Sequence, residues 1–375
     1  MTAAAAASSP RAQLLDCADF TDAAHRVLPG DVWDFIAGGA GRERTLAANE
    51  AAFGSIRLRP RGLAAVGEPD TTVRVFGTRW GAPLGVAPLA YHELAHSDGE
   101  AGTATAAAEL ELPLIVSMFA GQPLERIRAA AGEPAPLWLQ LYCFRDQEVT
   151  EGLARRAAAA GYQALVVTAD TPYMGRRLRD LRNHFRIPPH IRPVNLPPAT
   201  AHQEPSGSAV TGPDSPAAHS RSAFSADQDW TIVDRLRRIS GLPVVVKGVM
   251  TGRDTHVAIG AGAEGVIVSN HGGRQLDGAP AALDALPEVV TAAGGCVPVF
   301  LDGGVRSGAD AFTALALGAD AVFIGRPALY ALAAGGASGV RQLLSIMSGE
   351  LADTMVFTGH RTIPSIDANA VEMPR

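Results

Sequence analysis

The sequence predicts a closed (β/α)8 barrel, the TIM-barrel class of α/β folds, and three observations support this. Eight short apolar runs with strand composition recur from residue 82 onward, and Ala-rich helical stretches separate them. A weak internal repeat places Gly161, Gly262 and Gly318 each between a helical stretch and an apolar run. Polar residues follow the runs, where the carboxyl ends of parallel strands would meet. A doubly wound open sheet is the alternative, and the count of eight favours the barrel.

The chain before the barrel predicts helices. Apolar residues at helical spacing mark residues 12–27 and 31–37, and residues 42–53 can form a third helix after a glycine-rich break. Up to about residue 80, we expect a helical and hairpin-like N-terminal segment. Residues 1–11 are rich in Ala and Ser, without a basic region followed by a long apolar stretch. They are expected to be a flexible tail and not a secretion signal.

The eight predicted strands are short and apolar, as expected for strands buried on both faces. They span residues 83–87, 113–117, 137–141, 164–169, 243–247, 265–269, 298–302 and 321–324. Helical stretches such as 101–110, 151–160 and 309–317 separate them. A single barrel domain is therefore expected over residues 12–363, followed by a C-terminal tail over residues 364–375.

One segment interrupts the alternation. Residues 187–229 hold many Pro, Ser, Ala and His and few aliphatic residues. A loop of this length inside a compact domain is usually a lid or disordered. It follows the fourth predicted strand, so we expect a long mobile loop on the face that carries the active site.

Composition excludes several classes of protein. A hydrophobic content of 47% allows a large core and excludes wholesale disorder, and the net charge of −6 argues against a nucleic-acid partner. The three cysteines are scattered, with neither a disulfide framework nor metal-site spacing. We therefore expect a cytoplasmic location and no bound metal. No apolar run is long enough to cross a membrane, so no membrane association is expected.

The most informative stretch is Ser269–Gln275, directly after the sixth predicted strand. His271 can take a proton near neutral pH. Arg274 offers a planar fork that suits a carboxylate or a phosphate. A polar loop with a satisfied histidine is the alternative, but a His and an Arg at this spacing favour an active site.

Other predicted strand ends add polar groups. After the seventh and eighth strands, Asp302–Arg306 and Gly325-Arg326 resemble the phosphate grip that barrels form there. Lys247 at the end of the fifth strand suggests a site for an anion, although a structural ion pair or a Schiff-base lysine are alternatives. Asp170 and Arg177 follow the fourth predicted strand and could also belong to the site. The alternatives are that Asp170 caps a helix and that Arg177 lies on a solvated face. A phosphate-bearing cofactor and an anionic substrate are expected.

Together these motifs resemble the FMN-dependent 2-hydroxy-acid oxidases, which include glycolate, lactate and mandelate oxidising enzymes. The motifs are V-V-V-K-G, D-T-P-x-x-G-R-R, L-Q-L-Y, S-N-H-G-G-R-Q, and D-G-G-V-R with G-R-P, and the resemblance covers roughly residues 12–363. Within the family, residues 28–41, 86–92 and 175–183 are most similar to the actinobacterial 4-hydroxymandelate oxidases, which serve antibiotic biosynthesis.

The resemblance implies a role for each strand-end residue. His271 would be the active-site base, Asp170 would pair with it, and Tyr142 would hydrogen-bond near the reacting carbon. Arg177 and Arg274 would bind the substrate carboxylate. Lys247 would lie beside the FMN ring, which would be lined by Pro88, Leu89, Ala90, Ser117, Gln140, Thr168 and Ser269. The ribityl phosphate end would be held by Asp302, Gly303, Gly304, Val305, Arg306, Gly325 and Arg326.

The expected reaction is oxidation of a 2-hydroxy acid by O2, with hydrogen peroxide as the second product. The resemblance also implies that the protein is a homotetramer or another homo-oligomer. Many relatives carry a substrate-binding tyrosine where this chain has Phe35. An aromatic wall without the hydroxyl suits an aryl substrate, so 4-hydroxymandelate or mandelate is expected. The alternatives are a lactate or glycolate oxidase and a decarboxylating mono-oxygenase. More distant alternatives are a Schiff-base aldolase, a quinone-linked membrane dehydrogenase and a non-catalytic barrel.

Overall fold

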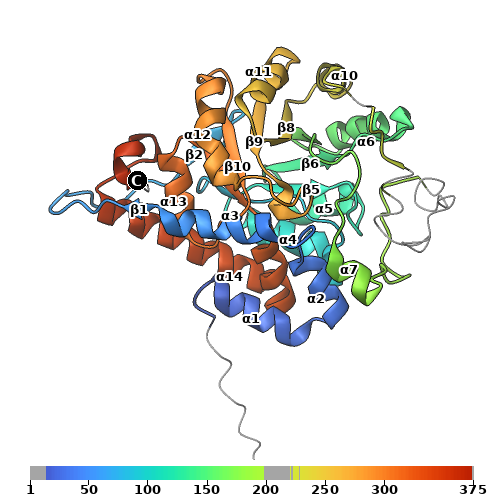
Figure 1. The fold of residues 1–375 in the computed structure, drawn as a ribbon, viewed down its shortest axis with the longest axis horizontal. Coiled ribbons are helices and arrows are strands. Elements are labelled where there is room, and N and C mark those ends of the chain that lie inside the picture. Colours follow the sequence, from blue (N-terminus) through green and yellow to red (C-terminus); the bar gives the residue numbers. More distant parts are fainter. Residues whose placement is uncertain (1–13, 198–219, 221–222, 228, 374–375) are drawn as a thin grey trace, which may run out of the picture.

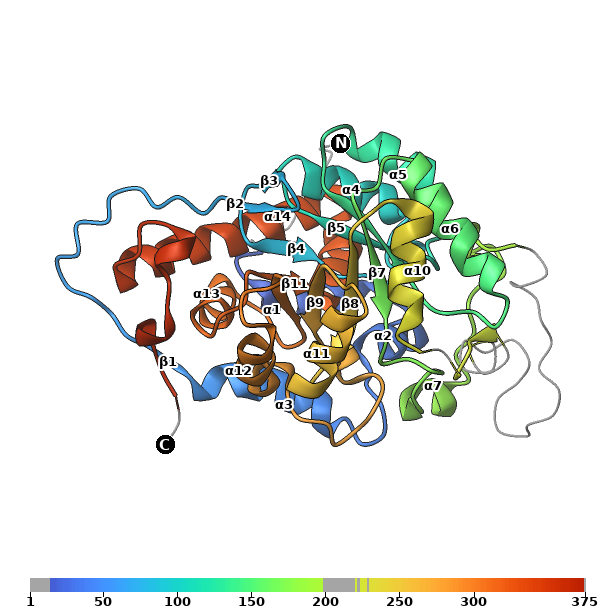
Figure 2. The same cartoon turned by 90° about the horizontal axis from the view of Figure 1, so that it is seen from above.

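The structure is a computed structural model that describes residues 14–197, 220, 223–227 and 229–373. Its centre is a closed barrel of parallel strands in the order β10-β11-β4-β5-β6-β7-β8-β9 (Figures 1 and 2). Pairing of β11 with β4, with Val322 opposite Leu84, closes the ring. The predicted (β/α)8 barrel is therefore confirmed.

Each predicted strand has its counterpart, with ends that differ by a residue or two. The barrel strands are β4 (Leu84–Val86), β5 (Leu114–Ser117), β6 (Leu137–Leu141), β7 (Ala164–Thr168), β8 (Val244–Val249), β9 (Gly265–Val268), β10 (Val299–Asp302) and β11 (Ala321–Ile324).

Nine described helices surround the barrel, and three of them begin at a side chain that satisfies a free backbone N–H group. Asp146, Thr251 and Ser307 each accept a hydrogen bond from an amide of the first turn that follows them. The nine helices are α4 (Gly99–Ala108), α5 (Leu124–Ala131), α6 (Gln147–Ala159), α7 (Leu178–Asn183), α10 (Thr231–Ser240), α11 (Gly252–Gly260), α12 (Ala282–Ala293), α13 (Gly308–Ala316) and α14 (Arg326–Thr358). Short 3-10 turns are η1 (His92–Leu94) and η2 (His271–Gly273).

The N-terminal segment forms α1 (Cys17–Val27), α2 (Gly30–Ala37), α3 (Arg44–Ser55), β1 (Arg57–Leu58) and a hairpin of β2 (Val73–Val75) and β3 (Thr78–Trp80). Helix α1 packs on α14, α2 packs on α7, and α3 packs on η2 (Figure 1). Since η2 directly follows β9, α2 and α3 lie at the carboxyl end of the barrel. The helical and hairpin-like character expected for this segment is confirmed.

The predicted C-terminal tail over residues 364–375 is described up to residue 373. It forms η3 (Ile363–Ser365), η4 (Ala368–Ala370) and β12 (Val371–Glu372), and β12 pairs antiparallel with β1. Ile363, Ala370 and Val371 are buried in a small apolar cluster with residues of α13 and α14. Burial of these side chains keeps the segment folded against the domain.

Aromatic side chains fill the amino end of the barrel. Trp80 of β3 packs against Trp138, Phe300 and Phe323, and all four side chains are fully buried. Burying each such side chain contributes roughly 1.5–3 kcal/mol. This end of the barrel is therefore closed, and a cavity is left at the carboxyl end.

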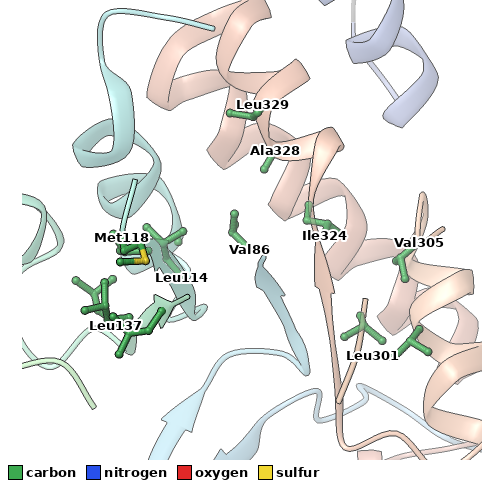
Figure 3. Close-up of a cluster of buried hydrophobic side chains, with 14 of the residues drawn as sticks. Val86, Leu114, Met118, Leu137, Leu301, Val305, Ile324, Ala328 and Leu329 are labelled. Atoms are coloured by element: carbon green, nitrogen blue, oxygen red, sulfur yellow. The ribbon is translucent and has the colours of Figure 1, made fainter. Parts of the chain in front are cut away.

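A second layer of the core lies between the strands and the helices. Val86, Leu114 and Leu137 point away from the barrel interior, and Ala328 and Leu329 of α14 face the same cluster (Figure 3). This packing fixes the start of α14 against the ends of the strands.

The long loop between β7 and α10 is described in part. Ile191, Asn195 and Leu196 are buried, and Phe224 forms an antiparallel bridge with Phe144. Both described ends therefore pack on the barrel. Of the mobile loop expected over residues 187–229, residues 198–219, 221–222 and 228 lie outside the described residues, as does the predicted tail over residues 1–11.

Candidate active site

The loop after β9 presents His271 to the carboxyl end of the barrel. His271 and Gly272 both adopt left-handed backbone conformations, with φ of 59° and 61°. Ser269 Oγ accepts from the His271 amide at 3.0 Å, and Asn270 Oδ1 accepts from the Gly273 amide at 3.0 Å. A left-handed histidine is strained, so these hydrogen bonds hold a conformation that the chain would not adopt alone.

Asp170 pairs with His271, as expected. Its Oδ1 lies 3.1 Å from His271 Nδ1 and accepts from the Thr171 hydroxyl at 3.0 Å. A carboxylate can only accept, so the imidazole proton is on Nδ1 and Nε2 is left as the acceptor. Burial lowers the pKa of His271 below its usual value, although Asp170 partly opposes this. A neutral imidazole, ready to take a proton at Nε2, is the consequence.

The charge of Asp170 is maintained by its neighbours. Burial alone would raise the pKa of this carboxyl, but attraction to His271, their hydrogen bond and the charge of Lys247 outweigh burial and lower the pKa. Asp170 is therefore an anion that stabilises a protonated imidazole.

Gly248 allows this approach. It forms a bulge in β8, with φ of 101°, and a Cβ there would lie 2.7 Å from the Asp170 Cβ and 2.9 Å from its amide nitrogen. Any larger residue would displace Asp170 from His271. The sequence signal was the glycine after Lys247, but nothing in the pattern indicated which residue occupies the space.

Tyr142 lies on the other side of the imidazole. Its hydroxyl is 3.4 Å from His271 Nε2. Burial raises the pKa of Tyr142, and the nearby charge of Asp170 adds to the effect. The phenol stays protonated and can donate a hydrogen bond to a ligand oxygen beside His271.

Arg177 is buried, Arg274 is partly buried, and both line the same cavity. Nε of Arg177 has no partner among the described residues, while Nη1 of Arg274 donates to the carbonyls of Ile36 and Gly38 at 3.1 and 2.8 Å. Burial lowers the pKa of Arg274, and repulsion from Arg177 lowers it further. Two guanidinium groups in this setting favour an anionic ligand.

Lys247 lies on the floor of the site. Its ammonium donates to Ser269 Oγ at 2.8 Å and pairs with Asp302 at 3.1 Å, and only 4% of the residue is exposed. The structural ion pair considered for Lys247 is thus present. It does not exclude a role beside a ligand, because Lys247 and Asp302 also line the cavity.

One cavity of about 670 Å³ brings the predicted residues together. This size is typical of a cofactor and substrate site. The predicted residues that line it are Phe35, Pro88, Leu89, Ala90, Ser117, Gln140, Tyr142, Arg177, Lys247, His271, Arg274, Asp302, Gly303, Gly304, Val305, Arg306, Gly325 and Arg326. Asp170, Thr168 and Ser269 lie behind this lining and act on it through His271, Gln140 and Lys247 respectively.

The cavity has the chemistry that a flavin mononucleotide requires. A buried cation, Lys247, lies on its floor. Ser117 supplies a hydroxyl group and Gln140 an amide group, and glycine backbone lies at the far end after β10. The two arginines at that end have protein partners: Arg306 contacts Glu50 at 2.6 Å, and Arg326 donates to carbonyls of α2, the α2 C-cap and η2. The residues present fit the cofactor, with Gly303, Gly304 and Arg306 as the phosphate end.

Two aromatic residues of the cavity wall, Phe119 and Phe224, were not predicted from the sequence. Phe119 follows β5 and Phe224 comes from the long loop, and both line the cavity. Phe224 stacks on Tyr142 with ring centroids 4.7 Å apart, and Phe119 lies 5.8 Å from Tyr142. Phe119 could have been found from its place after a predicted strand. Phe224 could not, because the loop around it has no periodic pattern.

Comparison with known proteins gives consistent results. The family model for FMN-dependent dehydrogenases matches residues 24–373. Human 2-hydroxyacid oxidase 1 is 43% identical over 354 residues, which cover 94% of this chain and 95% of that protein. A 4-hydroxymandelate oxidase from Amycolatopsis orientalis is 43% identical over 347 residues, which cover 92% and 95%. A crystal structure of a mandelate oxidase with (S)-4-hydroxymandelic acid superposes with a TM-score of 0.89 at 40% identity, covering 96% of this chain and 98% of that one.

Proposed function

Because the chain belongs to the FMN-dependent dehydrogenase family, and its relatives include 2-hydroxy-acid oxidases, we propose that it oxidises an aryl (S)-2-hydroxy acid. The proposed substrate is 4-hydroxymandelate or mandelate, and the product is the corresponding 2-oxo acid. When bound, FMN would take two electrons from the substrate and pass them to O2, so that one hydroxy acid and one O2 give one oxo acid and one H2O2. A cytoplasmic location and a homo-oligomer stay predictions.

The observation that carries this proposal is that aromatic rings, two arginines and a histidine line the same cavity. Phe119, Tyr142 and Phe224 offer an apolar aromatic surface, the two arginines offer positive charge, and His271 lines the same cavity beside Tyr142. An aryl 2-hydroxy acid has a ring, a carboxylate and a reacting carbon, one for each of these groups.

Each residue has a part in the proposed reaction. Arg177 and Arg274 bind the carboxylate and fix the orientation of the substrate. Neutral His271 takes one proton at Nε2, and the Asp170 carboxylate stabilises the imidazolium that forms. Tyr142 donates a hydrogen bond to the substrate oxygen. Lys247 keeps a positive charge at the cavity floor, where it would stabilise negative charge on the cofactor.

A lactate or glycolate oxidase is the second candidate, because a glycolate oxidase from Oryza sativa subsp. indica is also 40% identical over 358 residues. Ring burial against apolar walls is worth about 1.5–3 kcal/mol. At about 1.4 kcal/mol per factor of ten, an aryl acid should be preferred roughly tenfold to over a hundredfold.

Anaerobic rapid mixing with (S)-mandelate, (S)-4-hydroxymandelate, glycolate and lactate tests the proposal. We expect both mandelates to bleach the flavin with much the higher efficiency, and a matched amount of H2O2 and 2-oxo acid to form in air. Faster reduction by glycolate or lactate would refute the aryl substrate. Recovery of a decarboxylated acid in place of peroxide would identify a mono-oxygenase.

A further inference from the structure

Both arginines of the site lie over one aromatic ring. The Cζ atoms of Arg177 and Arg274 are 5.9 and 5.4 Å from the centroid of the Phe35 ring. The two cations repel each other, and this repulsion adds to burial in lowering the pKa of Arg274. Two like charges side by side in a buried site are costly unless negative charge compensates them. The face of an aromatic ring supplies such negative potential.

The Phe35 ring is held in place from behind. It stacks on Phe185 with centroids 4.3 Å apart and an angle of 14° between the rings, and only 8% of Phe35 is exposed. A ring so enclosed has a fixed orientation toward the guanidinium groups.

Helix α2, which carries Phe35, is tied to α7, which ends two residues before Phe185. Asn183 Nδ2 donates to Asp34 Oδ2 at 3.1 Å, and Arg179 pairs with Asp34 at 3.5 Å and with Glu43 at 2.6 Å. These bonds connect α7 to α2 and to the loop that follows α2. The stack of Phe35 on Phe185 thus lies beside a polar contact that joins α2 to α7.

The same end of α2 also supplies hydrogen-bond acceptors. Arg274 Nη1 donates to the carbonyls of Ile36 and Gly38, next to Phe35 in the chain. Carbonyls at a helix C-terminus carry partial negative charge and favour a cation. Ring and carbonyls together fix Arg274 on the cavity wall.

We propose that Phe35 is a positioning residue for the carboxylate-binding arginines, and not the wall for the substrate ring that the sequence suggested. Its face holds both guanidinium groups close enough for one carboxylate to bridge them. The aryl ring of the substrate is contacted instead by Phe119, Tyr142 and Phe224. This inference rests on the proposed function only in taking the ligand to be a carboxylate.

The test is equilibrium binding of benzoate and benzamide to the FMN-loaded protein, followed by the change in the flavin absorbance spectrum. The two probes share a ring and differ in charge. For Phe35→Leu we expect about tenfold weaker benzoate binding, within the range of cation–π contributions, and less than a twofold change for benzamide. Phe35→Tyr keeps the aromatic face and should bind benzoate within about threefold of the parent.

Phe144→Leu is the matched control, because Phe144 belongs to the aromatic cluster around Phe119 and Phe224 and does not line the cavity. It should not discriminate between the probes. Equal weakening of both probes by Phe35→Leu would show an apolar wall and overturn the proposal, as would unchanged benzoate binding or a tenfold loss in Phe35→Tyr.

If Phe35→Leu loses FMN, Phe35→Met takes its place in the same comparison. Failure of the proposed function would be seen separately. A protein that binds benzoate in this charge-selective way but reduces its flavin with none of the four hydroxy acids would refute the oxidase and leave the role of Phe35 intact.

Discussion

Replacing Asp170 by Asn tests whether the carboxylate stabilises a protonated His271. The substitution keeps the shape of the side chain and removes its charge. Asp170 Oδ1 lies 3.1 Å from His271 Nδ1, and unit charges at that separation interact by about 5 kcal/mol at an effective dielectric constant of 20. The charge of an imidazolium is spread over the ring, so the effective loss is smaller, about 3–4 kcal/mol. At 1.36 kcal/mol per factor of ten, this is roughly a 10²- to 10³-fold slower reduction of the flavin.

The pH dependence gives a second readout with a definite sign. Burial lowers the pKa of His271, and Asp170 opposes that shift. Without the carboxylate, the pKa of His271 should fall further, because the protonated form loses its stabilising partner. His271 must be neutral to act as a base, so the rate of flavin reduction falls as the pH drops below the pKa of His271. The acid limb of the rate profile should therefore move to lower pH in Asp170→Asn, while the plateau drops.

Stopped-flow reduction by mandelate between pH 5 and 9 measures both effects. Thr171→Val is the control, because its hydroxyl contacts the same Asp170 oxygen at 3.0 Å and carries no charge. It should slow reduction less than Asp170→Asn does, because it removes one hydrogen-bond donor and leaves the charge of Asp170 in place. A plateau for Asp170→Asn within threefold of the parent, or an acid limb moved to higher pH, would show that the charge of Asp170 is not what stabilises the imidazolium.

Three further outcomes are expected from the same site. His271→Ala should keep FMN and slow flavin reduction by ~10²–10⁴-fold or more, as measured by stopped flow, and near-parent reduction would remove His271 from the role of base. Arg274→Lys keeps a charge but loses the planar fork, so mandelate should bind more weakly and reduce the flavin more slowly; unchanged reduction at the same mandelate concentration would contradict the carboxylate role. Gly248→Ala places a methyl group 2.7 Å from the Asp170 Cβ, so it should slow flavin reduction nearly as much as Asp170→Asn. Gly54→Ala is the control, because a methyl group there meets open space and should not slow reduction. Equal rates for the two glycine variants would refute the packing argument.

The strands of the barrel could be predicted because each is a short apolar run, and most end at or just before a glycine or a polar residue. The residues after those runs, such as His271 and Lys247, could be assigned to one site since parallel strands end at one face. Their close neighbours could be predicted less well. That Asp170 lies against Gly248 depends on a bulge in β8, and a bulge has no signal in an apolar pattern.

Residues distant in sequence from the strand ends were hardest to assign. Phe35 was expected to contact the substrate ring; it lines the cavity, and the sequence did not indicate that two arginines and Phe185 lie against its ring. Periodicity identified α2 as a helix with an apolar face, but which element covers that face depends on α7 and its polar contacts. Phe224 was missed for the same reason, since its contact with Tyr142 depends on how the long loop returns to the barrel.

The three acceptors of Arg326 have a consequence for how the protein is made. Its guanidinium joins the carbonyls of Ile36, Gly38 and Gly272, so a residue near the end of the chain connects the N-terminal helices to the loop of His271. Strand β11, just before it, is also the last to close the ring, against β4. A chain emerging from the ribosome begins to fold from its N-terminus, but this site is complete only once the last strand and the start of α14 have left the exit tunnel. Stable cofactor uptake should therefore wait until Arg326 has left the ribosome.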